Sequence, residues 1–393
     1  MAVTRGLRGL GSRAMQLRSF LLSGNGWPYL LVPLIPLAII LDLAGVSPIA
    51  IFFVSAGGVI PTAALMGRAT EELAHRSGPG IGGLLNVTFG NAPEIIIALF
   101  ALNKGLHEVV KASLIGSMLG NILLVLGASM FVGGLGRDRQ RFDRTAASTQ
   151  SAMLLLAAVA LVMPAIFTLI QGNGLPLPGD EIRDYPSDVE NLSLAVAIVL
   201  MGTYAAGLLF SLKTHRDLFN PDHGAGSSEI DEESEDAPWT IRKAVVMLAV
   251  AGVAVGVMSE ILVGSISEAS HGVGLSEFFV GVIIVAIVGN AAEHWVAVLV
   301  ARKDQMDLAV NISIGSSAQI ALFAAPLLVM CSFFLGPHPM ALVFNGFEVG
   351  GVLLAVIIAN HVTNEGESTW FEGLQLLAVY VVLGLTFLFA GTG

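Results

Sequence analysis

Gly90-Asn91-Ala92-Pro93-Glu94 and Gly289-Asn290-Ala291-Ala292-Glu293 are two copies of one polar signature, placed 199 residues apart. A second signature keeps the same offset, because Ile115-Gly116-Ser117 recurs as Ile314-Gly315-Ser316. Each copy interrupts a long apolar run. Close packing between helices would explain the glycines but not the Asn and Glu side chains. The sequence therefore predicts two related halves, each with one acid inside an apolar segment.

The composition places both halves in a lipid bilayer. The chain has 393 residues, of which 54% are hydrophobic and 12% charged, and its mean hydropathy is +0.79. Soluble domains carry about 25% charged residues. A soluble enzyme and a nucleic-acid-binding protein are thereby excluded, and the single cysteine, Cys331, excludes a disulfide framework. The apolar runs are continuous rather than alternating, which disfavours a β-barrel. We expect an all-α, multi-pass integral membrane protein.

Hydropathy predicts eleven transmembrane helices of near the ~20 residues that span a bilayer. They cover residues 27–44, 48–70, 82–103, 108–133, 146–171, 190–212, 241–266, 276–301, 306–335, 340–362 and 370–390. The remaining organisation is a basic leader at 1–26, a first helix within 27–47, five spans within 48–212, an acidic cytoplasmic linker at 213–240, and five spans within 241–393. The leader is either a targeting peptide or a cytoplasmic segment on the membrane surface. The linker is either a solvated connection or a weak trap for divalent cations.

Lysine and arginine predict the orientation. With a cytoplasmic N-terminus, 16 of the 19 basic residues lie inside, and only Lys104, Lys111 and Arg183 lie outside. An odd number of spans then puts the C-terminus outside. The third and eighth spans, which carry Glu94 and Glu293, are an odd number of crossings apart and run in opposite directions. Inverted repeats of this kind hold substrate and coupling ions near the membrane midplane.

Glu94 and Glu293 are the principal site residues. A carboxylate inside an apolar span is costly unless it is paired, solvated or protonated, and neither span offers a nearby Lys or Arg. Such an acid needs a metal ion or a proton. Two carboxylates around a divalent cation would repel each other once the cation leaves, and protons would replace it. The alternative is a glutamate that only hydrogen-bonds between helices.

Polar and small residues around each glutamate complete the predicted site. Asn91 and Asn290 precede their glutamates by three residues and share a helical face with them, either as oxygen ligands or as groups that orient the acid. Gly90, Gly289 and Pro93 disturb helical hydrogen bonding and free backbone carbonyls. The other polar and small candidates, as ligands or cavity-lining groups, are Ser117, Ser316, Asn121, Gln319, Gly116 and Gly315.

A second pair of acids is a weaker candidate for proton relay or ion entry. Glu71 ends the second span, where it could equally belong to an interfacial cluster with nearby arginines, and Glu260 lies in the seventh. His294 follows Glu293 but projects about 100° away from it around the helix. It either titrates near neutral pH or packs against a neighbouring helix.

Four motifs together resemble the calcium/cation antiporter superfamily, and within it the Ca2+/H+ antiporters of the cation/proton exchanger branch. They are Gly-Asn-Ala-Pro-Glu (90–94), Gly-Asn-Ala-Ala-Glu-His (289–294), Gly-Ser-Met-Leu-Gly-Asn (116–121) and Gly-Ser-Ser-Ala-Gln (315–319). The resemblance implies 11 helices, with a peripheral first helix followed by two inverted five-helix repeats. It also implies alternating access, in which Glu94 and Glu293 bind either Ca2+ or protons but not both at once. Gly120 stands where the family pattern has serine, which leaves the ligand set of the fourth span open.

The sequence therefore predicts a secondary antiporter that exports cytoplasmic Ca2+ in exchange for H+, without a cofactor, in the plasma membrane if the source is prokaryotic. Na+-coupled exchange, a broader cation/H+ exchanger and a passive channel remain alternatives. An ATP-driven pump is disfavoured because the chain has no phosphate-binding loop. The protein is not expected to be an enzyme, and a homo-oligomer is possible.

Overall fold

The computed structural model describes residues 26–179, 185–210 and 239–391. Nearly all of the predicted leader and linker lie outside these ranges. Nine helices of the described chain are long and apolar enough to cross a membrane: Pro48–Ser77, His107–Gly134, Arg144–Ile170, Ser187–Leu209, Ile241–Val273, Glu277–Arg302, Met306–Ser332, Gly346–Thr363 and Trp370–Ala390. Two shorter apolar helices, Trp27–Leu43 and Ala92–Asn103, overlap the first and third predicted spans. The protein is thus a multi-pass, helical membrane protein.

The elements follow one another in two series. The first contains η1 (Trp27–Leu31), α2 (Leu34–Leu43), α3 (Pro48–Gly90), α4 (Ala92–Asn103), α5 (His107–Leu119), the π-helix η2 (Gly120–Val125), α6 (Leu126–Gly134), β1 (Gln140–Arg141), α7 (Arg144–Ile170) and α8 (Ser187–Leu209). The second contains α11 (Ile241–Val273), α12 (Glu277–Phe279), the π-helix η4 (Val280–Val285), α13 (Ala286–Arg302), α14 (Met306–Val310), the π-helix η5 (Asn311–Gly315), α15 (Ser316–Gln319), the π-helix η6 (Ile320–Ala324), α16 (Ala325–Ser332), α17 (Gly346–Thr363), β2 (Glu367–Ser368) and α18 (Trp370–Ala390).

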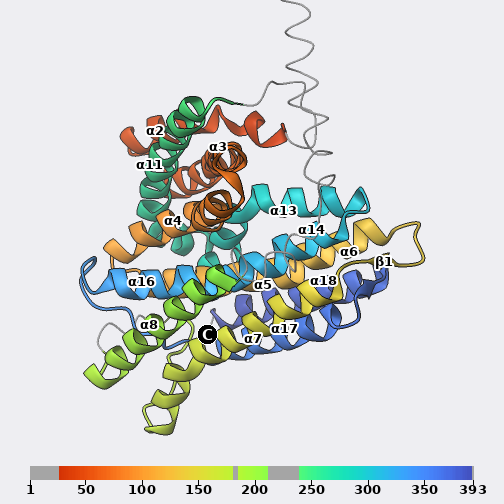
Figure 1. Cartoon of the computed structure of the whole chain (residues 1–393). Coiled ribbons are helices and arrows are strands. Elements are labelled where there is room, and N and C mark those ends of the chain that lie inside the picture. The colour runs from red at the N-terminus through yellow and green to blue at the C-terminus, as the bar shows by residue number, and fades with distance from the viewer. Residues whose placement is uncertain (1–25, 180–184, 211–238, 392–393) are drawn as a thin grey trace, which may run out of the picture.

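The helices form three groups in space (Figure 1). One group contains α2, α3 and α11, which pack together, and the opposite group contains α7, α8, α17 and α18. Between them lie α5, α6, α13, α14 and α16, so each half contributes helices to the central group. The two glutamates belong to α4 and α13, where the α3–α11 group meets this centre.

Helix α3 bends sharply between its predicted spans. A Cβ atom at Gly82 would lie 2.3 Å from the carbonyl oxygen of Ala74, although eight residues of straight helix cover about 12 Å. The chain therefore folds back within α3 itself. This bend lies where the sequence analysis separated the spans 48–70 and 82–103.

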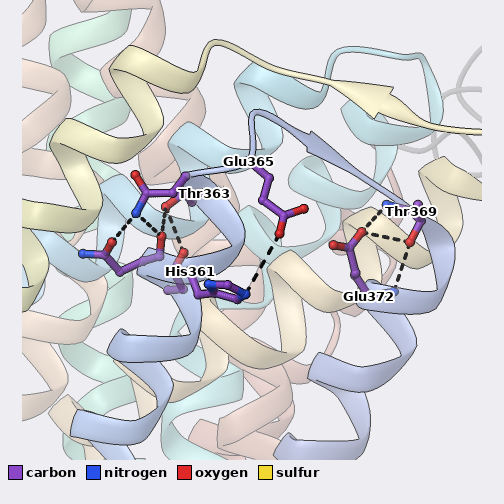
Figure 2. Close-up of polar contacts among 8 residues, drawn as sticks. His361, Thr363, Glu365, Thr369 and Glu372 are labelled. Carbon is purple, nitrogen blue, oxygen red and sulfur yellow. Dashed lines mark hydrogen bonds and ion pairs between the residues drawn. The ribbon is translucent and has the colours of Figure 1, made fainter.

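Side-chain caps fix where the last two helices begin. Asn345 accepts hydrogen bonds from the backbone of Phe347 and Glu348, and Glu348 accepts one from the Asn345 N–H, which forms a capping box. Residues 340–345 are consequently non-helical, and the predicted span 340–362 starts as a helix only at Gly346. Thr369 and Glu372 form the same box at α18 (Figure 2). Just before it, β2 pairs antiparallel with β1, which ties the two halves together.

Candidate ion-binding site

Glu94 and Glu293 come from opposite halves and meet across their glycines. Glu94 lies in the first turn of α4, and Glu293 lies in the middle of α13. A Cβ atom at Gly289 would lie 3.2 Å from Glu94 Cγ, and one at Gly90 would lie 3.9 Å from Glu293 Oε1. A Coulombic interaction also connects the two carboxyl groups. Each glutamate thus packs against the glycine of the other signature, and the crossing brings two acids together.

Three buried oxygen atoms of this crossing have no hydrogen-bond partner in the described structure. They are Glu94 Oε2, Asn91 Oδ1 and Asn290 Oδ1. Both asparagines are 1% exposed, so water does not satisfy them from the surface. Buried polar atoms are nearly always paired, and an unpaired set of acceptors needs an explanation. Carboxylate and amide oxygens are ligands that hard divalent cations prefer.

The donor groups of both asparagines are held by serine and glutamine side chains of the other half. Asn91 Nδ2 donates to Gln319 Oε1 at 2.8 Å. Asn290 Nδ2 donates to Ser117 Oγ and to the Ala286 carbonyl, both at 3.0 Å. Because the amide nitrogens are used in this way, both amide oxygens remain free to bind a cation.

Ser316 is a hydrogen-bond partner of Glu293. Its Oγ donates to Glu293 Oε2 over 3.4 Å, which is a long contact. Ser117 instead lines a small enclosed pocket beside Glu94, whose other walls include Ile97, Leu114 and Leu328. The two serines of the repeated Gly-Ser signature therefore both lie at the crossing, although they contact different partners.

Helix geometry differs between the two copies of the signature. Asn91 is non-helical, with φ −94° and ψ 18°, and separates α3 from α4, so that Pro93 and Glu94 lie in a first turn. The N–H groups of a first turn lack helical partners, which makes Pro93 compatible with this position. In the second half, α13 continues through Asn290, Ala292 and Glu293 without a break. The backbone disturbance expected at the first signature is thus present, and the one at the second is absent.

Two π-helical segments occur at matching positions after the Gly-Ser signatures. They are η2 in the first half and η6 in the second. Nearby, Ser317 Oγ donates to the Met118 carbonyl at 3.4 Å, and these two residues are themselves 199 positions apart. Single π-turns are frequent at functional sites. The sequence analysis did not predict them, because a shifted backbone hydrogen bond leaves no distinct side-chain pattern.

The remaining small residues of the fourth and ninth spans serve different contacts. A Cβ atom at Gly116 would lie 2.0 Å from the Val282 carbonyl oxygen, so only glycine permits this approach of α5 to η4. Gly315 faces Asn311 and Gln150 instead. Of the predicted cavity-lining glycines, Gly90 and Gly289 are therefore the ones that face the glutamates.

His294 contacts the first half rather than Glu293. Its Nε2 lies 3.1 Å from Asn121 Oδ1, and a Cβ atom at Gly120 would be 3.9 Å from its Cε1. Asn121 Nδ2 has no partner among the described residues. A Cβ atom at position 120 would thus be in ordinary van der Waals contact with the imidazole ring.

The second acidic pair separates in the structure. Glu71 lies close enough to Glu293 for a Coulombic interaction, and Glu72 accepts a hydrogen bond from the Trp239 N–H at 2.9 Å. Glu260 lies on the exposed side of α11, in line with Val253 and Val257, while its neighbour Ser259 is fully buried. Only Glu71 thus lies near the crossing.

The described residues contain no group of three or more His, Cys, Asp and Glu side chains placed to hold a metal ion. Any cation at the crossing must therefore draw its further ligands from amide, hydroxyl, backbone or water oxygens.

Comparison with known proteins shows the family of this chain. The profile of the family described as "Sodium/calcium exchanger protein" matches residues 47–213 and 243–389, which include both glutamate signatures. The chain belongs to this family. Members of the sodium/calcium exchanger family are transporters rather than enzymes, so the two acids of this exchanger-family protein are candidates for transport and not for catalysis.

Three relatives of this exchanger-family protein match it over most of its length. The Ca(2+)/H(+) antiporter ChaA of Bacillus subtilis (strain 168) is 44% identical over 354 residues, which cover 90% of this chain and 96% of that protein. The Ca(2+)/H(+) antiporter of Synechocystis sp. is 42% identical over 366 residues, which cover 91% and 95%. Vacuolar cation/proton exchanger 1a of Oryza sativa subsp. japonica is 38% identical and covers 92% and 79%.

Solved structures share the fold. Native YfkE superposes with a TM-score of 0.76 at 40% identity and covers 92% of this chain and 99% of that chain. The H+/Ca2+ exchanger CAX has a TM-score of 0.67 at 16% identity, covering 94% and 93%, which is a likeness of fold alone. The arrangement of helices in this exchanger-family protein is therefore one that membrane exchangers use.

Proposed function

We propose that this protein is a secondary antiporter that exchanges Ca2+ for H+ and moves Ca2+ out of the cytoplasm. The observation that carries the proposal is the reciprocal packing of Glu94 against Gly289 and of Glu293 against Gly90. It places two carboxyl groups and two unpaired amide oxygens at one crossing of the halves. The names of the two bacterial relatives, both Ca(2+)/H(+) antiporters, support the choice of ions.

The proposed Ca2+ ligands are Glu94, Glu293, Asn91 and Asn290, with Ser117 and Ser316 beside them. Ca2+ takes six to eight oxygen ligands, so water and backbone carbonyls complete the shell. Two carboxylates balance the charge of one Ca2+. Gln319 holds the Asn91 amide so that its oxygen stays available.

Protons replace Ca2+ in the second half of the exchange. Two carboxylates in an apolar surrounding repel each other when the cation leaves, and this repulsion is removed by protonation. Ca2+ and protons then occupy the same groups in turn, which couples their opposite movements. Glu71 is proposed as a proton-relay or ion-entry group on the Glu293 side. The same role is proposed for Glu260, which lies on the exposed side of α11. His294 is proposed to line the cavity, where its contact with Asn121 holds the imidazole ring.

Inverted repeats and alternating access belong to the same proposal. The connection between α4 and α5 contains Gly105 with φ +76°, and 199 residues later Asp304 has φ +68°. The matching π-helices support the same relation between residues 48–212 and 241–393. We infer that eleven segments cross the membrane, with the second part of α3 and α4 counted together as one segment and the first helix peripheral. We also infer that the N-terminus is cytoplasmic and the C-terminus outside.

The test is Ca2+ movement into proteoliposomes with an imposed pH gradient. Glu94→Gln and Glu293→Gln each keep the side-chain shape but remove the charge, and each is expected to abolish gradient-dependent Ca2+ transport and the opposing proton flux. Glu268→Gln is the matched control, because Glu268 is an exposed acid of α11 away from the crossing.

Transport that survives either substitution at the crossing would overturn the site. Ca2+ flux that ignores the pH gradient but follows a Na+ gradient would replace H+ with Na+ as the coupling ion. Downhill flux without counterflow of either ion would indicate a channel.

A further inference from the structure

A groove with two arginines lies between the ends of α6 and α13, at the end of the bundle where Figure 1 labels β1. It is lined by Val132, Leu135, Gly136, Arg137 and Arg302. Arginine side chains bind phosphate oxygens through paired N–H groups. The groove also has an apolar side, where Leu135 is 55% exposed and could contact an acyl chain.

The two arginines have different roles. Arg137 is held by contacts within the protein. It donates hydrogen bonds to the carbonyls of Gly133 and Arg302, and its Nε lies 3.4 Å from Asp304 Oδ1. It therefore holds the C-terminal ends of two helices together, and Asp304 balances its charge. Arg302 is exposed, and its guanidinium group has no hydrogen-bond or ion-pair partner in the described chain. The uncompensated positive charge of the groove thus comes from Arg302.

Neighbouring residues place the groove at the membrane surface. Trp370, the first residue of α18, is 43% exposed, and its backbone lies 2.7 Å from where a Cβ atom of Gly134 would be. Tryptophan is enriched at the boundary between hydrocarbon and headgroups. Both arginines also belong to the basic side of the chain, which is proposed to be cytoplasmic, where anionic lipids are attracted to basic pockets between helices.

We propose that this groove binds the phosphate headgroup of an anionic phospholipid, with Arg302 as the principal ligand and Leu135 against the acyl chain. The bound lipid would contact the end of α13, the helix that carries Glu293. It would thereby link α6 of the first half to α13 of the second on the membrane side. This proposal is independent of the transported ions.

The test measures lipid binding by the full-length protein with native mass spectrometry in detergent. Phosphatidylglycerol and phosphatidylcholine with identical acyl chains are compared on the unmodified protein, Arg302→Gln and Arg242→Gln. Arg242 is an exposed arginine at the start of α11, outside the groove, and serves as the matched control. We expect phosphatidylglycerol to be retained over phosphatidylcholine. We also expect Arg302→Gln to weaken its retention about fivefold, the effect of one basic residue near an anionic surface, and Arg242→Gln to leave it unchanged.

Equal retention by Arg302→Gln and the unmodified protein would overturn the proposal, as would equal loss in Arg242→Gln. Competition with inorganic phosphate and glycerol phosphate distinguishes the sources of the ligand. If either soluble compound displaces the lipid at a concentration similar to that of the lipid itself, the site binds free phosphate and the lipid assignment is wrong. Unchanged thermal melting of Arg302→Gln shows that the fold is intact.

Discussion

Glu94 and Glu293 occupy equivalent places in the sequence but different surroundings in the structure. Glu94 follows a break in the helix and borders a pocket walled by Ile97, Leu114 and Leu328. Glu293 lies within an unbroken helix, accepts a hydrogen bond from Ser316 and interacts with the charge of Glu71. The repeat thus reproduces the chemical groups without reproducing the backbone. The surroundings of the two acids therefore differ, although both lie at the same crossing.

The helix break gives the largest expected difference between the halves. Ala292→Pro copies Pro93 into the second signature, where position 292 lies inside α13 and its N–H takes part in the helix. Proline in a helix interior costs about 3 kcal/mol. The reverse change, Pro93→Ala, removes a proline from a first turn and should cost less than about 1 kcal/mol.

Thermal melting in detergent would show this as a much lower melting temperature for Ala292→Pro than for Pro93→Ala. Similar melting temperatures for the two variants would mean that the second signature tolerates the same break. The two signatures would then not differ in the backbone geometry that they require.

The glycine contacts give the next largest difference. Gly289→Ala would place a Cβ atom 3.2 Å from Glu94 Cγ, a tighter contact than the 3.9 Å between a Cβ atom at Gly90 and Glu293 Oε1. Overpacking costs about 1–3 kcal/mol. We expect Gly289→Ala to slow Ca2+/H+ exchange about tenfold or more because Glu94 must shift to admit the Cβ atom, and small misplacements of a reacting group cost large factors in rate. Gly90→Ala meets only an ordinary van der Waals contact, so we expect it to slow exchange about threefold or less.

Initial rates of Ca2+ uptake at saturating and limiting Ca2+ would measure both effects. A larger defect in Gly90→Ala than in Gly289→Ala would contradict the unequal packing at the crossing, even if both glutamates remain essential for transport.

The main features of the fold follow from the sequence because they depend on local pattern. Apolar runs predict membrane helices, which the described chain contains. The repeated signatures with Glu94 and Glu293 predict two related halves, which stays a prediction. The proline at position 93 also indicates a disturbed helix where the structure has one. These features need only the periodicity and the chemistry of neighbouring residues.

Features that depend on distant contacts were not predicted. The hydrogen bond between Asn91 and Gln319 joins residues 228 positions apart, and no signal within either segment specifies it. The rotation of α11 is a second example. Glu260 follows Ser259 by one residue, but a step of about 100° around the helix places it on the exposed side. The sequence indicates how far Glu260 lies from the ends of its span. It does not indicate which side of the helix the Glu260 side chain occupies.

The two serines of the Gly-Ser signatures give the smallest and most specific difference. Ser117→Ala removes an acceptor that lies 3.0 Å from Asn290 Nδ2, although the Ala286 carbonyl keeps that amide partly satisfied. Ser316→Ala removes a donor that lies 3.4 Å from Glu293 Oε2. A hydrogen bond contributes about 0.5–1.5 kcal/mol, so we expect the KM for Ca2+ to rise about fivefold in Ser117→Ala and about twofold in Ser316→Ala.

The comparison must be made on KM, because both serines lie beside proposed ligands and their loss is expected to change ion binding. Ser117→Thr and Ser316→Thr keep the hydroxyl group and control for its loss. If Ser316→Ala raises KM more than Ser117→Ala does, the hydroxyl of Ser316 binds Ca2+ directly in the loaded state. The second half would then supply more of the ligands than the first.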